Sequence, residues 1–253
     1  MQISIPETSA GVQIFALASV LTTAGALLLF LVRVSDHGAR RGVLLFAGLF
    51  ALYYTALGFA AHGGHLADFS AFPPRILFPL VFLPLCASIY IVLSSGFGRL
   101  LAFISPVHLT LFQIYRIFAE ILIAWLVIEQ AMPETMTVTG RNFDLFAPLT
   151  APVAASFFAR SNQGRFALAA LFFWNMAASL ILANTVATAV LSMPTPGRVF
   201  FDGPPVVIPA VFPFYLLPAF YVPLAFAVHA ASFRKIVQLW PRRKAAFETL
   251  QAQ

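Results

Sequence analysis

Seven long apolar stretches constrain this chain more than any other feature of its sequence. A helix that crosses a bilayer needs about 20 mainly apolar residues. The stretches cover about residues 11–33, 43–61, 75–95, 105–129, 144–160, 166–192 and 206–233. We therefore expect an all-α protein, an integral membrane bundle of seven transmembrane helices that forms a single domain over residues 1–253.

Composition supports a membrane protein and excludes an ordinary soluble enzyme. Only 9% of the residues are charged, whereas a soluble domain carries about 25%. The single cysteine, Cys86, excludes an internal disulfide framework and any cysteine-based metal cage. The net charge of +6 does not indicate a nucleic-acid partner, because the basic residues fall in short clusters between apolar stretches. We expect the lipid bilayer to be the main partner.

The distribution of basic residues predicts the orientation, because cytoplasmic loops carry an excess of Lys and Arg. One set of loops holds only Arg75, Arg141 and Arg198. The alternate set holds Arg33, Arg40, Arg41, Arg99, Arg160, Arg165, Arg234, Lys235, Arg242, Arg243 and Lys244. We expect the N-terminus outside and the C-terminus in the cytoplasm. The preference for Arg over Lys is typical of a GC-rich bacterial genome, so we expect a bacterial cytoplasmic (inner) membrane.

Proline affects two of the stretches. The stretch 144–160 is the shortest and contains Pro148 and Pro152, so a re-entrant segment is the alternative to a full span. The stretch 206–233 contains Pro209, Pro213, Pro218 and Pro223. Each interior proline removes a backbone hydrogen bond, which predicts kinks that open a cavity or are accommodated by packing.

Two charges lie in the middle of the stretch 105–129. Arg116 lies near the expected bilayer midplane, and Glu120 follows four residues later, so both share one helix face and are expected to pair. Gln113 lies on the same face. Ionisable groups at this depth mark functional sites by default. The alternatives are an anion-recognising or proton-handling centre, or a neutralised pair that only locks helix packing.

Polar residues also interrupt the stretch 166–192. Asn175 and Asn184 lie on roughly opposite faces of the expected helix. A helix that is polar on two sides is expected at the centre of the bundle, because lipid disfavours either polar face. Interhelical hydrogen bonds are the ordinary explanation of such residues, and contact with a ligand is the alternative.

The histidines give two weak indications of cofactors. His62, His65 and Asp68 lie close together in an outer loop and are candidate metal ligands, although no fourth ligand is evident. His108 and His229 lie at similar depths near the inner ends of their helices, which suits axial haem ligation or interfacial packing. No nucleotide-binding or hydrolase motif is present, so neither an enzymatic activity nor a cofactor is predicted.

The loop from Met132 to Asp144 is rich in side chains that hydrogen-bond their own backbone. Gly140 is expected to permit a positive φ, and Asp144 to cap the following helix. Arg141 is expected to pair with Glu134 or Asp144, or to contact an anionic ligand. An ordered lid without a ligand is the alternative.

The segment F-Q-I-Y-R-I-F-A-E, the string G-R-N-F-D and the later W-N and P-L-A-F-A-V-H runs resemble an uncharacterised family of small bacterial multi-pass membrane proteins. The resemblance implies no activity. It implies only the positions of interest, which are Arg116, Glu120, Arg141, Asn142, Asp144, Asn175 and His229.

The leading hypothesis is a protein that binds or transports a small molecule. Its site would lie in the outer half of the bundle, with Arg116 and Glu120 as the floor. Asn175 and Asn184 would form the wall, and Arg141 with Asp144 the lid. The alternatives are a haem- or quinone-binding subunit of a membrane enzyme that uses His108 and His229, and a structural accessory subunit.

Overall fold

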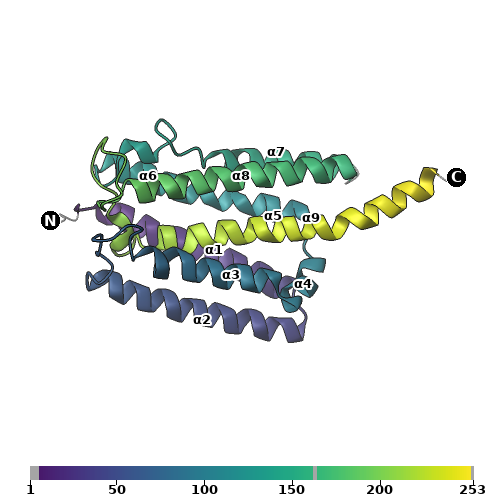
Figure 1. The fold of residues 1–253 in the computed structure, drawn as a ribbon. Helices are drawn as coiled ribbons and strands as arrows, with labels where there is room; N and C mark the ends of the chain where they lie inside the picture. The colour runs from purple at the N-terminus through teal and green to yellow at the C-terminus, as the bar shows by residue number, and fades with distance from the viewer. Residues whose placement is uncertain (1–5, 162–163, 252–253) are drawn as a thin grey trace.

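The computed structural model describes residues 6–161 and 164–251 and, for side chains, residues up to 240. These parts of the chain contain helices, turns and loops but no strand, which confirms the all-α class. Most helices run side by side along one direction, with their connections at the two ends of the bundle (Figure 1).

The helices lie within or near the predicted stretches, although the helix of the last stretch begins and ends later than predicted. The α-helices are α1 (Ala10–Val34), α2 (His37–His62), α3 (Leu83–Leu93), α4 (Ser95–Ala102), α5 (Pro106–Phe112), α6 (Arg116–Ile128), α7 (Phe146–Arg160), α8 (Arg165–Leu191) and α9 (Val222–Gln251). Short 3-10 or π-helical segments are η1 (Phe78–Phe82), η2 (Gln113–Tyr115), η3 (Glu134–Met136), η4 (Ile208–Ala210) and η5 (Leu217–Tyr221).

Side-chain caps explain where several of these helices begin. The Asp36 carboxylate accepts a hydrogen bond from the Ala39 N–H at 2.7 Å and starts α2. Each such cap satisfies one of the N–H groups that lack a partner at a helix start. Serine side chains do the same for α1, α4 and α5, through Ser9, Ser94 and Ser105.

Within the described residues, four segments are long and apolar enough to cross a membrane: α1, α2, the α5–α6 segment (Pro106–Ile128) and α8. A fifth is reached if Phe78–Leu93 and Ser95–Ala102, which meet at 65°, form one broken span. These apolar helices place the chain among integral membrane proteins. They do not by themselves establish seven spans.

The stretch predicted at 144–160 forms a helix, but a short one. Helix α7 has 15 residues, which corresponds to about 22 Å at 1.5 Å per residue. The side chain of Asp144, just before this helix, contacts Arg116 in the middle of the α5–α6 segment. Helix α7 therefore begins deep in the bundle, where the loop before it lies beside the α5–α6 segment.

The prediction of a helix from residue 206 is wrong for the first part of that stretch. Residues 206–215 form turns and the 3-10 segment η4, and regular helix follows η5. Pro209 and Pro213 explain the difference, because proline cannot donate the backbone hydrogen bond that a continuous helix needs. Val206, Ile208 and Phe214 in this segment are nonetheless fully buried.

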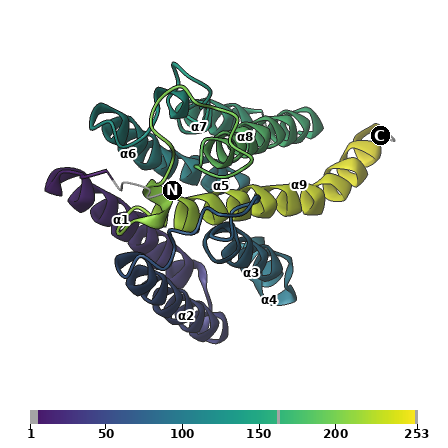
Figure 2. The same cartoon turned by 60° about the vertical axis from the view of Figure 1, so that its left-hand side comes forward.

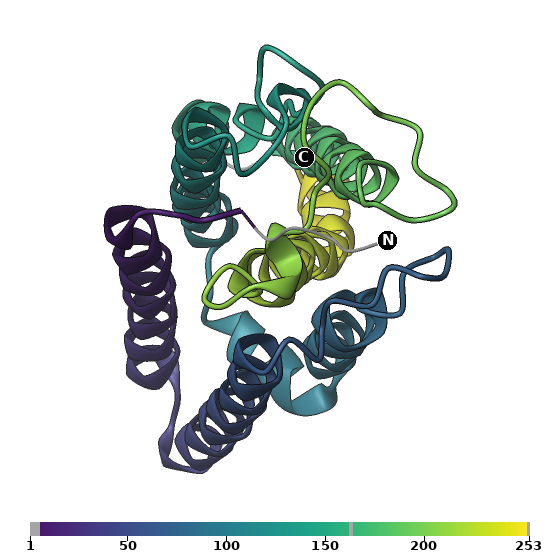
Figure 3. The ribbon, with the colours of Figure 1, turned by 90° about the vertical axis from the view of Figure 1, so that its left-hand side faces the viewer.

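Helix α9 occupies the centre of the bundle, and the other helices surround it (Figures 2 and 3). It packs against α3, α5 and α8. The expectation that the helix over 166–192 would be central is wrong, because α8 leaves Phe166, Phe173 and Leu180 exposed on one side. Its polar residues are satisfied by neighbours on its inner side and by the loop before α7.

Two cations of α9 tie down neighbouring helix ends. Nη1 of Arg234 donates hydrogen bonds to the carbonyl oxygens of Val92 and Ser94 at the end of α3. Nζ of Lys235 donates to the carbonyl oxygens of Leu101 and Ala102 at 2.8 and 3.0 Å, at the end of α4. Cations stabilise the carboxyl ends of helices, where carbonyl groups lack intrahelical partners.

We expect Arg234→Met to destabilise the protein by about 1.5–3 kcal/mol, because two carbonyl groups lose charged hydrogen bonds. Thermal unfolding in detergent measures the effect. The matched control is Arg33→Met, because Arg33 is an exposed arginine at the same end of the bundle. An equal change in both variants would contradict the capping role.

Candidate functional site

Arg116 is the largest side chain that the bundle encloses almost completely. It is only 2% exposed, although it lies in a segment long enough to cross the membrane. By helical rise it is about 15 Å from Pro106 and about 18 Å from Ile128. The 3-10 segment η2 directly precedes it and interrupts the regular helix. A buried charge at this depth needs a partner.

The partner of Arg116 is Asp144 and not Glu120. Nε of Arg116 donates to Oδ2 of Asp144 at 3.0 Å, and Nη2 donates to Oδ1. The prediction of a pair within one helix is therefore wrong. The carboxylate of Asp144, which comes from another segment, meets the planar guanidinium with two parallel hydrogen bonds. Glu120, four residues along the same helix, does not contact the guanidinium in this way.

His229 of α9 contacts the remaining arm of this guanidinium. Nη1 of Arg116 lies 3.1 Å from Nε2 of His229, and Nδ1 of His229 lies 2.9 Å from Oδ1 of Asn175. Because the guanidinium only donates, Nε2 accepts and Nδ1 carries the proton that it donates to Asn175. The amide of Asn175 also donates to the carbonyl oxygen of Leu171 at 2.8 Å. Three helices and one loop thus meet at Arg116.

Glu120 contacts a second part of the same loop. Nδ2 of Asn142 donates to Oε1 and Oε2 of Glu120 at 3.2 and 2.9 Å. Oδ1 of Asn142 accepts from the Thr185 hydroxyl at 2.7 Å and from the Asp144 N–H at 3.0 Å. Asn142 is completely buried. We call these seven residues the polar centre: Arg116, Glu120, Asn142, Asp144, Asn175, Thr185 and His229.

The loop before α7 is inserted between helices and is not a lid above them. Gly140 is needed for close approach, because a Cβ atom there would lie 2.5 Å from the carbonyl oxygen of Glu134. The predicted positive φ at Gly140 is wrong, since the positive-φ glycines are Gly64 and Gly203. The predicted capping by Asp144 is also wrong, because its carboxylate is used by Arg116 and α7 begins without a side-chain cap.

Arg141 and Asn184 lie outside the polar centre. The guanidinium of Arg141 is exposed and lies 4.6 Å from the ring centre of Phe200. The predicted pair of Arg141 with Glu134 or Asp144 is not formed. Glu134 accepts a hydrogen bond from Thr139, and Asp144 is bound to Arg116. Nδ2 of the exposed Asn184 donates to the carbonyl oxygen of Arg141 at 2.7 Å and so fastens the loop to α8.

The candidate metal ligands do not form a metal site. No group of three His, Cys, Asp or Glu side chains suited to a metal occurs in the described part of the chain. Hydrogen bonds from the hydroxyl and the N–H of Ser70 lower the pKa of Asp68, which also pairs with Arg75. The ring of His62 packs against Phe212, and His65 folds back over Gly63.

The two histidines of the haem alternative are not brought together as ligands. Both ring nitrogens of His229 have partners within the polar centre. His108 is exposed and packs against Phe30. The residues present therefore do not fit a pair of axial haem ligands.

Gln113 stands out because its buried side-chain amide lacks hydrogen-bond partners. It is completely buried, and neither its amide nitrogen nor its amide oxygen has a hydrogen-bond partner among the described residues. It lies one turn before Arg116, in η2, which packs against α7. A buried amide without partners is costly, so a polar molecule or a water beside it would lower the free energy.

Sequence reasoning missed that Asp144 pairs with Arg116 and that Asn142 pairs with Glu120, and it missed the roles of Thr185 and His229. For the first two contacts the available signal was the N-F-D string, which places an amide and a carboxylate two residues apart. The buried Arg116 needs a carboxylate, and the partly buried Glu120 accepts hydrogen bonds from an amide.

A comparison with family models matches residues 71–237 to a domain of unknown function (DUF8737). The matched range contains the whole polar centre and leaves α1 and α2 outside. The resemblance to an uncharacterised family is confirmed at this level. Comparisons with curated proteins and with solved structures gave no match.

We expect Asp144→Asn to destabilise the protein by about 3–5 kcal/mol, because it leaves the Arg116 charge buried without a counter-charge. Glu120→Gln is the matched control. It should cost about 1 kcal/mol or less, since a glutamine oxygen still accepts from Asn142. Thermal unfolding in detergent compares them. Equal losses would contradict the assignment of Asp144 as the partner.

Proposed function

The chain belongs to the DUF8737 family, and from this premise we propose that it is a seven-span inner-membrane protein that binds or transports a small polar molecule at the polar centre and at Gln113, one turn before Arg116. The family match covers the helices that build this centre. The N-terminus would lie outside and the C-terminus in the cytoplasm of a bacterium. In this proposal, α7 with the loop before it and α9 with the segment before it supply the two crossings beyond the five apolar ones.

The discontinuous crossings support this topology. Non-helical backbone at membrane depth is tolerated only where it is buried in protein or lines a polar cavity. The loop that carries Asn142 and Asp144 and the segment 206–215 both meet that condition, since their key residues are buried. Short or broken helices at membrane depth are also the usual place of substrate sites in transporters.

The observation that carries the binding proposal is the unpartnered amide of Gln113. Gln113, Arg116 and Glu120 follow one another at helical spacing, so they lie on one face of the α5–α6 segment. Arg116 and Glu120 have protein partners, whereas both amide atoms of Gln113 have none in the described chain. A molecule with hydrogen-bonding groups that reached Gln113 would be about one helical turn from Arg116.

A structural accessory role is the second candidate. It is favoured by the completeness of the hydrogen bonds around Arg116, which three helices and a loop already satisfy. In that case the polar centre joins helices and needs no ligand.

The topology is tested by accessibility of single cysteines. In a Cys86→Ser background, we expect Thr139→Cys to react with a membrane-impermeant maleimide in intact cells. Arg41→Cys should react only after the cells are opened. The reverse pattern, or reaction at both sites in intact cells, would contradict the proposed orientation.

The binding site is tested by mass spectrometry of small molecules that remain with the purified full chain. We expect a stoichiometric polar molecule in the wild type and its loss in Gln113→Leu. Thr110→Val is the matched control, because Thr110 is buried one turn away and its hydroxyl is satisfied by the Pro106 carbonyl.

The same molecule retained equally by Gln113→Leu would contradict binding at this site. A wild type without any small molecule, together with an unaltered fold in Gln113→Leu, would favour the structural role.

A further inference from the structure

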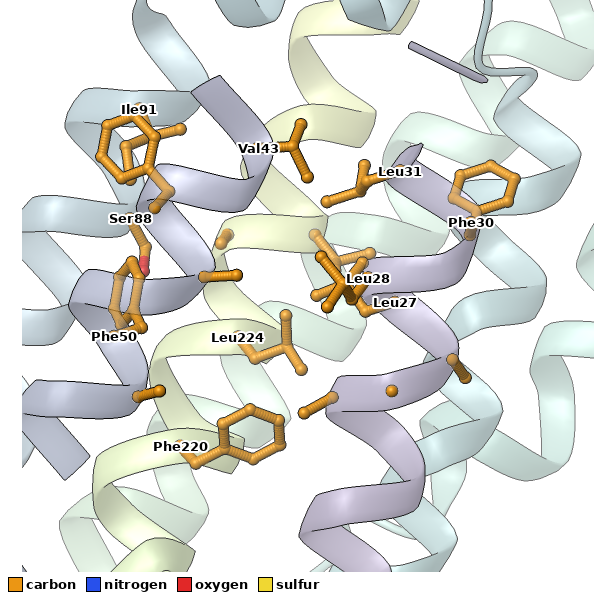
Figure 4. A pocket seen from close by; sticks show the side chains of 18 of the residues that line it. Leu27, Leu28, Phe30, Leu31, Val43, Phe50, Ser88, Ile91, Phe220 and Leu224 are labelled. Carbon is orange, nitrogen blue, oxygen red and sulfur yellow. The ribbon is translucent and has the colours of Figure 1, made fainter. Parts of the chain in front are cut away.

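One feature that the polar centre does not explain is an apolar cavity of about 1490 Å³. It lies between α1, α2 and α9, and residues of α3, α4 and α5 complete its wall (Figure 4). No residue of the polar centre lines it. Typical sites for drug-sized ligands have about 300–1,000 Å³, so this cavity suits a larger and more apolar occupant.

The cavity exists because α1 and α2 have fully buried residues only near one end of the bundle. The buried residues of α2 are Leu57, Gly58 and Ala61, all in its last two turns. The buried residues of α1 lie in its first half, up to Thr23. Toward the turn that joins α1 to α2, both helices stand away from α9, as the view along the bundle shows (Figure 3).

The middle of the cavity is lined by hydrocarbon. Leu27, Leu28, Phe50, Phe220 and Leu224 surround the space in Figure 4. Small residues on the two outer helices widen it: a Cβ atom added at Gly25 or Gly42 would meet nothing within 4 Å. Such a wall favours saturated or unsaturated chains and disfavours a polar solute.

The end of the cavity near the α1–α2 turn is basic. Arg99 and His108 line it there, and both are exposed. Arg40 follows the lining residue Ala39, and its buried Nε has no hydrogen-bond partner among the described residues. Asp36, the acidic residue in this region, uses a carboxylate oxygen to cap α2. Positive charge at the mouth of an apolar slot is complementary to an anionic headgroup.

We propose that this cavity binds the acyl chains of an anionic phospholipid, whose phosphate lies near Arg99 at the mouth. Acyl chains suit the hydrocarbon wall in the middle of the cavity, and the basic residues at its end suit an anionic headgroup.

Native mass spectrometry of the full chain in mild detergent tests this, with dioleoyl phosphatidylglycerol and dioleoyl phosphatidylcholine as probes. We expect the wild type to retain the anionic lipid about tenfold better than the zwitterionic one, which is about 1.4 kcal/mol. Gly42→Phe fills the slot and should abolish retention. Gly48→Phe is the matched control, since Gly48 is on the same helix with equally open surroundings but does not line the cavity.

Arg99→Gln tests the headgroup separately and should bring retention of the two lipids to the same level. Circular dichroism and the melting temperature confirm that each variant is folded. Equal retention of lipid by Gly42→Phe and Gly48→Phe would overturn the site. An unchanged preference in Arg99→Gln would overturn the headgroup assignment. A protein dimer that Gly42→Phe disrupts would show that a second copy occupies the slot.

Discussion

The ion pair between Arg116 and Asp144 is the interaction on which the rest of the bundle depends. A guanidinium at membrane depth cannot reach water, so its charge must be met by a carboxylate in the same place. Asp144 can be there only because the loop before α7 is inserted between helices. The loop in turn needs Gly140 for close approach and Asn142 for its links to Glu120 and Thr185. One buried cation therefore explains why an irregular loop is buried inside the bundle.

The polar centre and the apolar cavity divide the molecule into two parts with different chemistry. The helices from α5 to α8 meet around hydrogen bonds that fix one arrangement. Helices α1 and α2, which lie outside the matched family range, leave a slot against α9. Helix α9 belongs to both parts, since it carries His229 on one side and lines the slot with Leu224 and Ala227 on another.

Much of the fold could be predicted from hydrophobic periodicity and length, because long apolar runs have few alternatives to helix in a membrane. The bounds of α1 and α8 follow from the sequence almost to the residue. The late start of α9 did not follow, because hydropathy does not reveal where prolines interrupt a helix. The partner of Arg116 did not follow either, since spacing within a helix favours Glu120. Only tertiary packing brings Asp144, 28 positions away, to the guanidinium.

Double-mutant cycles on unfolding in detergent test the central claim most directly, since they isolate the coupling between two side chains. The pairs are Arg116→Met with Asp144→Leu, and Arg116→Met with Glu120→Gln. The account predicts a coupling of about 2–3 kcal/mol for the first pair and below about 0.5 kcal/mol for the second. A large coupling between Arg116 and Glu120, with little between Arg116 and Asp144, would contradict it.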